Sequence, residues 1–221
     1  MPIFSPIHVV YFKSLNGISV KRDDLIDPYI SGNKWRKLKY ILQDVLQNNK
    51  NHLVTFGGAY SNHLVATAAA AARNNLRSTA FVRGENVENE MLLLCKLFGM
   101  QLIFVDRESY KNKAELFSSH FGDDEKAYFI NEGGASPEAT IGCAEIIDEL
   151  TVTYDHIFCA AGTGTTADQR LPRSRTVDAQ AGERHTTQPA AGRQHRVAGT
   201  AAHAQQQRIT AAGPANRWHI A

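Results

Sequence analysis

Residues 52–82 read "HLVTFGGAYSNHLVATAAAAARNNLRSTAFV", and this stretch decides the fold class. A short apolar run at 52–56 is followed by a Gly-Gly turn, an alanine-rich helical segment at 61–75 and a second apolar run at 78–82. A strand, a helix and another strand in this order form the unit from which parallel sheets are built. The stretch therefore predicts a parallel sheet here.

The same alternation continues toward residue 160. Short apolar runs predict further strands at 101–105, 127–130 and 156–161. Between them, helical spacing predicts helices at 88–99, 109–122 and 136–150, the last opening with Ser136 as its cap and Pro137 at its first position. This pattern predicts an α/β fold with a mostly parallel sheet covered by helices.

Three glycine-bearing turns follow predicted strands: "GGAYSN" after 52–56, "NEGG" after 127–130 and "GTGTT" after 156–161. Ligands of parallel sheets bind outside the carboxyl ends of the strands. The last turn, Gly162, Thr163, Gly164, Thr165 and Thr166, offers backbone N–H groups and hydroxyls suited to a phosphate. It also matches G-x-G-x-x-A through Gly162, Gly164 and Ala167, so a dinucleotide site is an alternative, as is a merely structural turn.

The stretch "SGNKWRKLKY", residues 31–40, places four cations in the first turns of a predicted helix that Ser31 or Asn33 would cap. Cations are mildly unfavourable at a helix N-terminus, so they are either solvated or close to an anion. A partly desolvated lysine among cations is also a better nucleophile. Lys34, the helix start at Ser61 and Asn62, and a phosphate-binding turn together suggest pyridoxal phosphate.

Bulk composition is that of a globular protein, with 43% hydrophobic and 21% charged residues in 221. Residues 1–167 hold 16 Lys and Arg against 19 Asp and Glu, which gives no reason to expect a specific nucleic-acid partner. No secretory signal or membrane-length apolar run is visible. Cys95, Cys143 and Cys159 lack metal spacing, so we expect no metal site, reduced cysteines and a cytoplasmic location.

The pattern ends at about residue 167. Residues 168–221 hold eight Arg and no Lys, Phe or Tyr, and show neither a helical nor a strand period. Such a composition buries little apolar area, so we predict disorder for this segment. The abrupt change favours an out-of-frame translation after a frameshift near codon 167 over a natural basic tail.

Five motifs carry a family resemblance: "KRDDL" (21–25), "SGNKWRKLKY" (31–40), "GGAYSNH" (57–63), "NEGGAS" (131–136) and "AAGTGTT" (160–166). With them the chain resembles the D-cysteine desulfhydrase and 1-aminocyclopropane-1-carboxylate (ACC) deaminase group of pyridoxal-phosphate enzymes. These have the tryptophan-synthase-β-like fold, fold type II. The resemblance covers roughly residues 1–167.

The resemblance implies two open, mostly parallel sheets covered by helices in two domains. Residues 52–131 would form the smaller, mobile domain, and 1–51 with 132–167 would form part of a larger one. Family members continue for roughly another hundred residues, none of which can be matched in 168–221. The large domain is therefore expected to be incomplete.

The same resemblance implies roles for individual residues. Lys34 would form the internal aldimine, Asn62 would bond the 3′-oxygen of the pyridoxal ring, and Ser61 would touch the substrate carboxylate or assist proton transfer. Gly162, Thr163, Gly164, Thr165 and Thr166 would hold the phosphate with help from Lys37.

The implied reaction passes through an external aldimine and a carbanion, and releases ammonia and a 2-oxo acid from a small amino acid. A homodimer is the implied assembly. The alternatives are an inactive truncated remnant of such an enzyme and, more weakly, a dinucleotide-binding protein.

Overall fold

The computed structural model describes residues 4–12, 15–154, 156–159 and 218–220. The chain divides into two compact units. One contains residues 26–142, and the other combines residues 1–25 with 143–221. The predicted smaller domain, 52–131, lies inside the first of these, and its limits remain a prediction.

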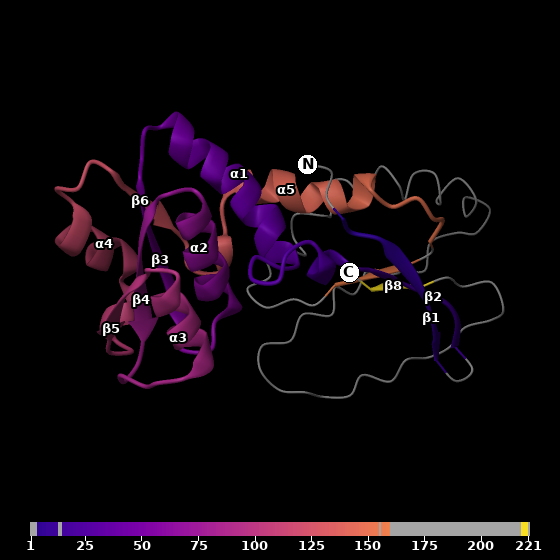
Figure 1. Cartoon of the computed structure of the whole chain (residues 1–221), viewed down its shortest axis with the longest axis horizontal. Coiled ribbons are helices and arrows are strands. Elements are labelled where there is room, and N and C mark those ends of the chain that lie inside the picture. Colours follow the sequence, from indigo (N-terminus) through magenta and orange to yellow (C-terminus); the bar gives the residue numbers. More distant parts are fainter. Residues whose placement is uncertain (1–3, 13–14, 155, 160–217, 221) are drawn as a thin grey trace, which may run out of the picture. The chain divides into compact units, whose positions relative to one another are not determined.

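The unit of residues 26–142 is built on one fully parallel sheet (Figure 1). Its strands lie in the order β5-β4-β3-β6 and have the following bounds: β3 His52–Gly58, β4 Arg77–Arg83, β5 Gln101–Val105 and β6 Ala127–Ile130. All three pairings are parallel, so the carboxyl ends of the four strands meet at one edge. The predicted strands and the α/β class are confirmed.

Helices cover both faces of this sheet. They are α1 Asn33–Gln47, α2 Asn62–Arg73, α3 Glu90–Leu97 and α4 Lys113–Phe121, with short 3-10 turns η2 Ser109–Lys111 and η3 Glu132–Gly134. Alternate residues of β3 face opposite layers, as strand geometry requires. Leu53 packs with α1 and α2, whereas Val54 and Phe56 pack with η2 and α4.

The second unit contains a mixed sheet in the order β1-β2-β8-β7. Its strands are β1 Ile7–Phe12, β2 Leu15–Lys21, β7 His156–Phe158 and β8 Trp218–Ile220, and the 3-10 turn η1 Asp23–Leu25 follows β2. β1 and β2 are antiparallel, and the other two pairings are parallel. The β1–β2 hairpin was not among the predicted elements.

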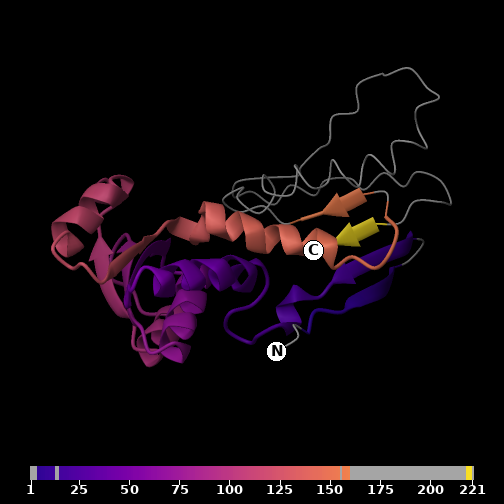
Figure 2. The ribbon, with the colours of Figure 1, turned by 90° about the horizontal axis from the view of Figure 1, so that it is seen from above.

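The structure describes one short segment of the tail. This segment forms strand β8, Trp218–Ile220, which lies between β2 and β7 (Figure 2). A strand flanked on both sides is held by main-chain hydrogen bonds, which need no hydrophobic period in the sequence. The rest of the tail, with the predicted disorder and the proposed frameshift point, lies outside the described residues.

Two predicted helix starts have different outcomes. α5, Pro137–Asp148, begins as predicted, because the Ser136 hydroxyl accepts a hydrogen bond from the Ala139 N–H at 3.1 Å. At α1 the predicted side-chain cap is wrong: the N-cap residue is Gly32, with φ 61°. The chain enters α1 through a left-handed turn that glycine adopts without steric cost.

None of the helices in the described ranges is both long and apolar enough to cross a membrane.

Candidate functional site

The loop after β3 forms the first part of the candidate site. β3 ends at Gly57 and Gly58, and α2 begins four residues later with Ser61 as its N-cap residue. A Cβ atom on Gly57 would lie 2.8 Å from the Leu64 side chain and 3.0 Å from the Ser61 hydroxyl oxygen. Gly57 therefore lets the loop fold tightly onto α2 and leaves the Ser61 hydroxyl close to the backbone of the loop.

Ser61 occupies the N-cap position of α2, but its side chain makes no capping hydrogen bond. Ser61 is half-buried and Asn62 is exposed. Both polar side chains therefore retain contact with solvent at the carboxyl end of β3. This placement is what a ligand-contacting role would need, and the individual roles remain predictions.

The cations at the start of α1 are not a solvated face. Arg36 and Lys37 are fully buried, and Lys34 is half-buried. Lys39 is half-buried as well, and its ammonium group lies 4.8 Å from the centre of the Tyr40 ring and 5.8 Å from that of Trp35. Burying cationic side chains is costly unless polar or anionic groups compensate, so the groups that meet these side chains matter for the stability of the helix start.

Two of these lysines form hydrogen bonds with the loop after β6. The ammonium groups of Lys34 and Lys37 both donate to the carbonyl oxygen of Gly133, at 3.3 Å and 3.1 Å. This carbonyl belongs to η3, which follows β6, and Glu132 of the same turn forms an ion pair with Lys113 at 3.3 Å. Two positive charges therefore lie together at the carboxyl edge of the sheet.

His63 joins the two loops and was not among the predicted site residues. Its side chain is 2% exposed, and its Nε2 lies 2.8 Å from the Thr55 hydroxyl on β3. A Cβ atom on Gly134 would lie 3.4 Å from Cε1 of His63 and 3.6 Å from the Lys37 side chain. Burial, and then the charges of Lys34 and Lys37, lower the pKa of His63 to about 3. The ring is therefore neutral under ordinary conditions.

The arrangement brings Lys34, Lys37, Gly133 and His63 together, and it places Ser61 and Asn62 in the residues that directly precede His63. The predicted phosphate-binding residues, Gly162, Thr163, Gly164, Thr165 and Thr166, lie outside the described residues. Within the described ranges, no group of three or more His, Cys, Asp or Glu side chains could hold a metal ion.

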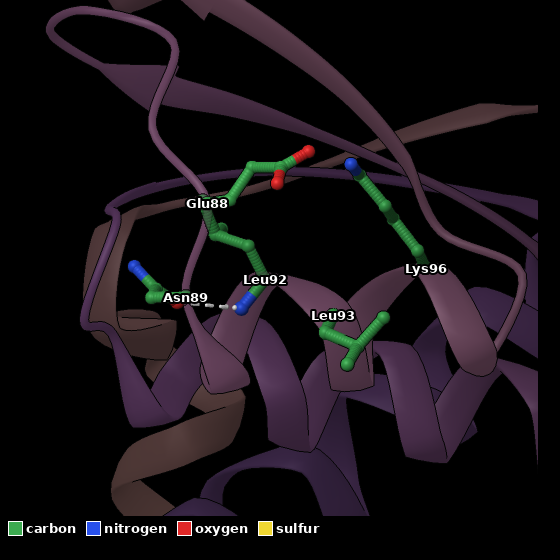
Figure 3. Close-up of a pocket in the computed structure, with 5 residues that line it drawn as sticks. All are labelled: Glu88, Asn89, Leu92, Leu93 and Lys96. Atoms are coloured by element: carbon green, nitrogen blue, oxygen red, sulfur yellow. Dashed lines mark hydrogen bonds between the residues drawn. The ribbon is translucent and has the colours of Figure 1, made fainter.

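A separate surface cavity of about 300 Å³ lies along α3 and is lined by Glu88, Asn89, Leu92, Leu93 and Lys96 (Figure 3). The Asn89 side chain accepts a hydrogen bond from the Leu92 N–H at 2.9 Å, so this residue is used to cap α3. None of the predicted site residues lines this cavity. The Asn89 side chain therefore serves the helix, and the candidate site remains the edge occupied by Lys34 and Gly133.

Comparison with known sequences points to one family. Residues 6–168 match the model of the family described as pyridoxal-phosphate dependent enzyme. A Thermotoga maritima protein, provisionally named a 1-aminocyclopropane-1-carboxylate deaminase, is 38% identical over 176 residues, which cover 73% of this chain and 56% of that protein. The D-cysteine desulfhydrase of Yersinia enterocolitica is 29% identical over 164 residues, covering 67% of this chain and 50% of the relative.

Solved structures agree with this relationship. The crystal structure of an ACC deaminase homologue superposes with a TM-score of 0.61 at 34% identity, over 69% of this chain and 49% of that one. A hydrogen sulfide-producing enzyme from Fusobacterium nucleatum, at 18% identity and a TM-score of 0.60, shares the fold. The chain spans about half the length of the curated relatives it matches. With the family model matched over residues 6–168, the chain belongs to the pyridoxal-phosphate-dependent enzymes.

Proposed function

We propose that this chain carries the site of a lyase or deaminase of the D-cysteine desulfhydrase or ACC deaminase type, acting on a small amino acid. The products would be ammonia and a 2-oxo acid. The observation that supports this proposal best is the convergence of Lys34 and Lys37 on the Gly133 carbonyl, beside His63 and the Ser61–Asn62 helix start.

The residues present fit pyridoxal phosphate. The ammonium groups of Lys34 and Lys37 both donate to the neutral Gly133 carbonyl oxygen, and Nδ1 of the buried His63 ring has no hydrogen-bond partner among the described residues. An anionic phosphate would relieve the repulsion between the two cations. Lys34, the more exposed of the two lysines, is the one with access to a carbonyl carbon. The fully buried Lys37 suits a fixed electrostatic role.

In this proposal Lys34 would hold the cofactor covalently, and Lys37 would support its phosphate together with residues 162–166. Asn62 would donate to an oxygen of the cofactor ring, and Ser61 would bind the substrate carboxylate or move a proton. Pyridoxal phosphate, when bound, supplies an electron sink that stabilises negative charge on the substrate. The protein residues position the reacting groups and keep Lys34 able to gain and lose a proton.

Of the two alternative functions, the dinucleotide-binding protein has the weaker support. The dinucleotide alternative rests on Gly162, Gly164 and Ala167, and the matched family includes this stretch as part of a pyridoxal-phosphate enzyme. The inactive-remnant alternative is an outcome of the test below. A cytoplasmic location, a homodimer and the lack of a specific nucleic-acid partner remain predictions.

The experiment measures ammonia and 2-oxo acid release by the full chain, supplied with pyridoxal phosphate, from D-cysteine, L-cysteine and ACC. Lys34→Ala removes the proposed attachment point, and Lys39→Ala is the matched control on the same helix, where the lysine lies against Trp35 and Tyr40. The proposal expects turnover of one substrate that is lost in Lys34→Ala and kept in Lys39→Ala. No turnover of any of them would favour the inactive remnant.

A further inference from the structure

His63 has a hydrogen-bonding arrangement that fixes which of its ring nitrogens carries the proton. The Thr55 hydroxyl donates its one hydrogen to the Ile130 carbonyl oxygen at 3.1 Å. At its other contact, 2.8 Å from Nε2 of His63, the same oxygen can only accept. Nε2 therefore carries the hydrogen, and in a neutral ring Nδ1 is left with a lone pair.

This Nδ1 atom is buried and has no hydrogen-bond partner within the part of the chain that the structure describes. A buried acceptor without a partner is costly, so this atom calls for a physical explanation. The positive charges closest to the ring are those of Lys34 and Lys37 from α1, which lie on the neighbouring Gly133 carbonyl. From β3 the ring meets the Thr55 hydroxyl, and from η3 it faces Gly134, where an added Cβ atom would lie 3.4 Å from Cε1 of the ring.

Lys34 is the better donor of the two. Its contact with the Gly133 carbonyl, at 3.3 Å, is longer than that of Lys37 at 3.1 Å. Lys34 is also only half-buried, so its side chain has room to change rotamer, whereas Lys37 is enclosed. An ammonium group has three N–H donors, so Lys34 can donate to the ring nitrogen as well as to the Gly133 carbonyl oxygen.

We propose that His63 is a positioning residue for Lys34: its Nδ1 lone pair accepts a hydrogen bond from the Lys34 amine and holds that amine at the carboxyl edge of the sheet. This inference rests on the proposed function, in which Lys34 is the reactive amine. The Thr55–Ile130 contact is the second part of the arrangement, since it keeps Nδ1 free of hydrogen.

The ring accepts a hydrogen bond without acting as a base. Burial and the two lysine charges disfavour its protonated form, with a pKa of about 3, so a proton received from an ammonium group would return to it at once. His63 would thus orient Lys34 and stabilise its charged form. Proton removal during a reaction would need another group.

The first test reads the tautomer directly. Nitrogen-15 NMR of the full chain without cofactor is expected to show His63 protonated at Nε2 and bare at Nδ1. In Thr55→Val, which removes the acceptor but keeps the shape, a mixture of both tautomers is expected. A hydrogen on Nδ1 in the unaltered chain would overturn the proposal.

The second test measures the reactivity of each lysine toward an amine-acylating reagent, by mass spectrometry and again without cofactor. His63→Gln keeps a polar group near the Nε2 position but lacks an acceptor at Nδ1. Because a hydrogen bond to a charged group stabilises the ammonium form, its loss should speed labelling of Lys34 about tenfold. The exposed Lys96 is the internal reference, and Lys37 should change little.

His63→Asn supplies the matched control, since its amide oxygen can replace the Nδ1 acceptor, and it should keep Lys34 labelling within about twofold of the unaltered chain. Unchanged Lys34 labelling in His63→Gln would overturn the proposal. An equal rise at Lys34 and Lys37 would do so too, because it would indicate general opening of the structure. Neither test uses bound pyridoxal phosphate, so their failure is distinct from failure of the proposed function.

Discussion

Gly142 lies where α5 crosses α1, and replacing it by alanine tests whether that close approach exists. Gly142 and Arg36 belong to the same compact unit, 26–142. A Cβ atom at 142 would overlap the Arg36 carbonyl oxygen and lie 2.7 Å from the carbonyl carbon. Ordinary contact begins at 3.4 Å, and the obstacle is backbone, so no side-chain rotation can relieve it.

The magnitude follows from two opposing effects. Inside a helix, alanine is favoured over glycine by about 1 kcal/mol. Overpacking against a neighbouring element typically costs about 1–3 kcal/mol, and the upper part of that range applies because α1 must move as a whole. We therefore expect Gly142→Ala to lower the free energy of unfolding by about 2 kcal/mol.

The assay is urea denaturation followed by circular dichroism, where a loss of this size lowers the midpoint by about 1 M. Ile141→Ala is the matched control, because Ile141 is the preceding residue of α5 and is 51% exposed. It should change stability by about 0.5 kcal/mol or less. If Gly142→Ala were as stable as the unaltered chain, or more stable, the described packing of α5 on α1 would be refuted.

Three further predictions concern the sheet of the same unit. The hydrogen bond from His52 lowers the pKa of the Asp124 carboxyl group in the folded chain. The Asp124 carboxylate therefore contributes its full stabilisation above the ordinary carboxyl pKa, and this stabilisation is lost as the pH falls through the lower pKa of the folded state. The difference in urea midpoint between the unaltered chain and Asp124→Asn should be present at about pH 6 and vanish toward about pH 2; an equal difference at both would contradict this. Burial raises the pKa of the Cys95 thiol to about 12, so alkylation followed by mass spectrometry should be about a thousandfold slower in the folded chain than in urea. Equal alkylation rates in the two conditions would show that Cys95 is accessible in the folded chain. Phe56 stacks on Phe81 at a ring-centroid distance of 5.0 Å and both rings are fully buried, so Phe56→Ala should lower stability by about 3–5 kcal/mol in a denaturation assay; a loss below about 1 kcal/mol would exclude this packing.

The parallel sheet could be predicted from sequence because its signals are local. Each strand is a short apolar run that ends at a turn residue, and each helix between them has its own period. The order β5-β4-β3-β6 could not be predicted this way, since it depends on which faces of the helices pack together. The β1–β2 hairpin was missed although Ile7, Val9, Ile18 and Val20 alternate with other residues, which is a strand signal.

The candidate site shows the same limit. Lys34 and Lys37 stand out in the sequence as misplaced cations, but their meeting at Gly133 joins residues almost a hundred positions apart. The burial of His63 was also missed, because a single histidine is more often exposed or supporting. Its position at the start of an alanine-rich helix that is buried along most of its length was the available signal. The sequence of β8 carries no such signal, because this strand depends on its pairing with β2 on one side and β7 on the other.

The most direct test of the central claim is to trap the cofactor on the protein. The full chain is incubated with pyridoxal phosphate, reduced with borohydride and digested, and the modified lysine is identified by mass spectrometry. We expect one phosphopyridoxyl group, on Lys34, with Lys37 and Lys39 unmodified and no labelling of the Lys34→Ala variant. Modification of a different lysine, or of none, would contradict the assignment of this site.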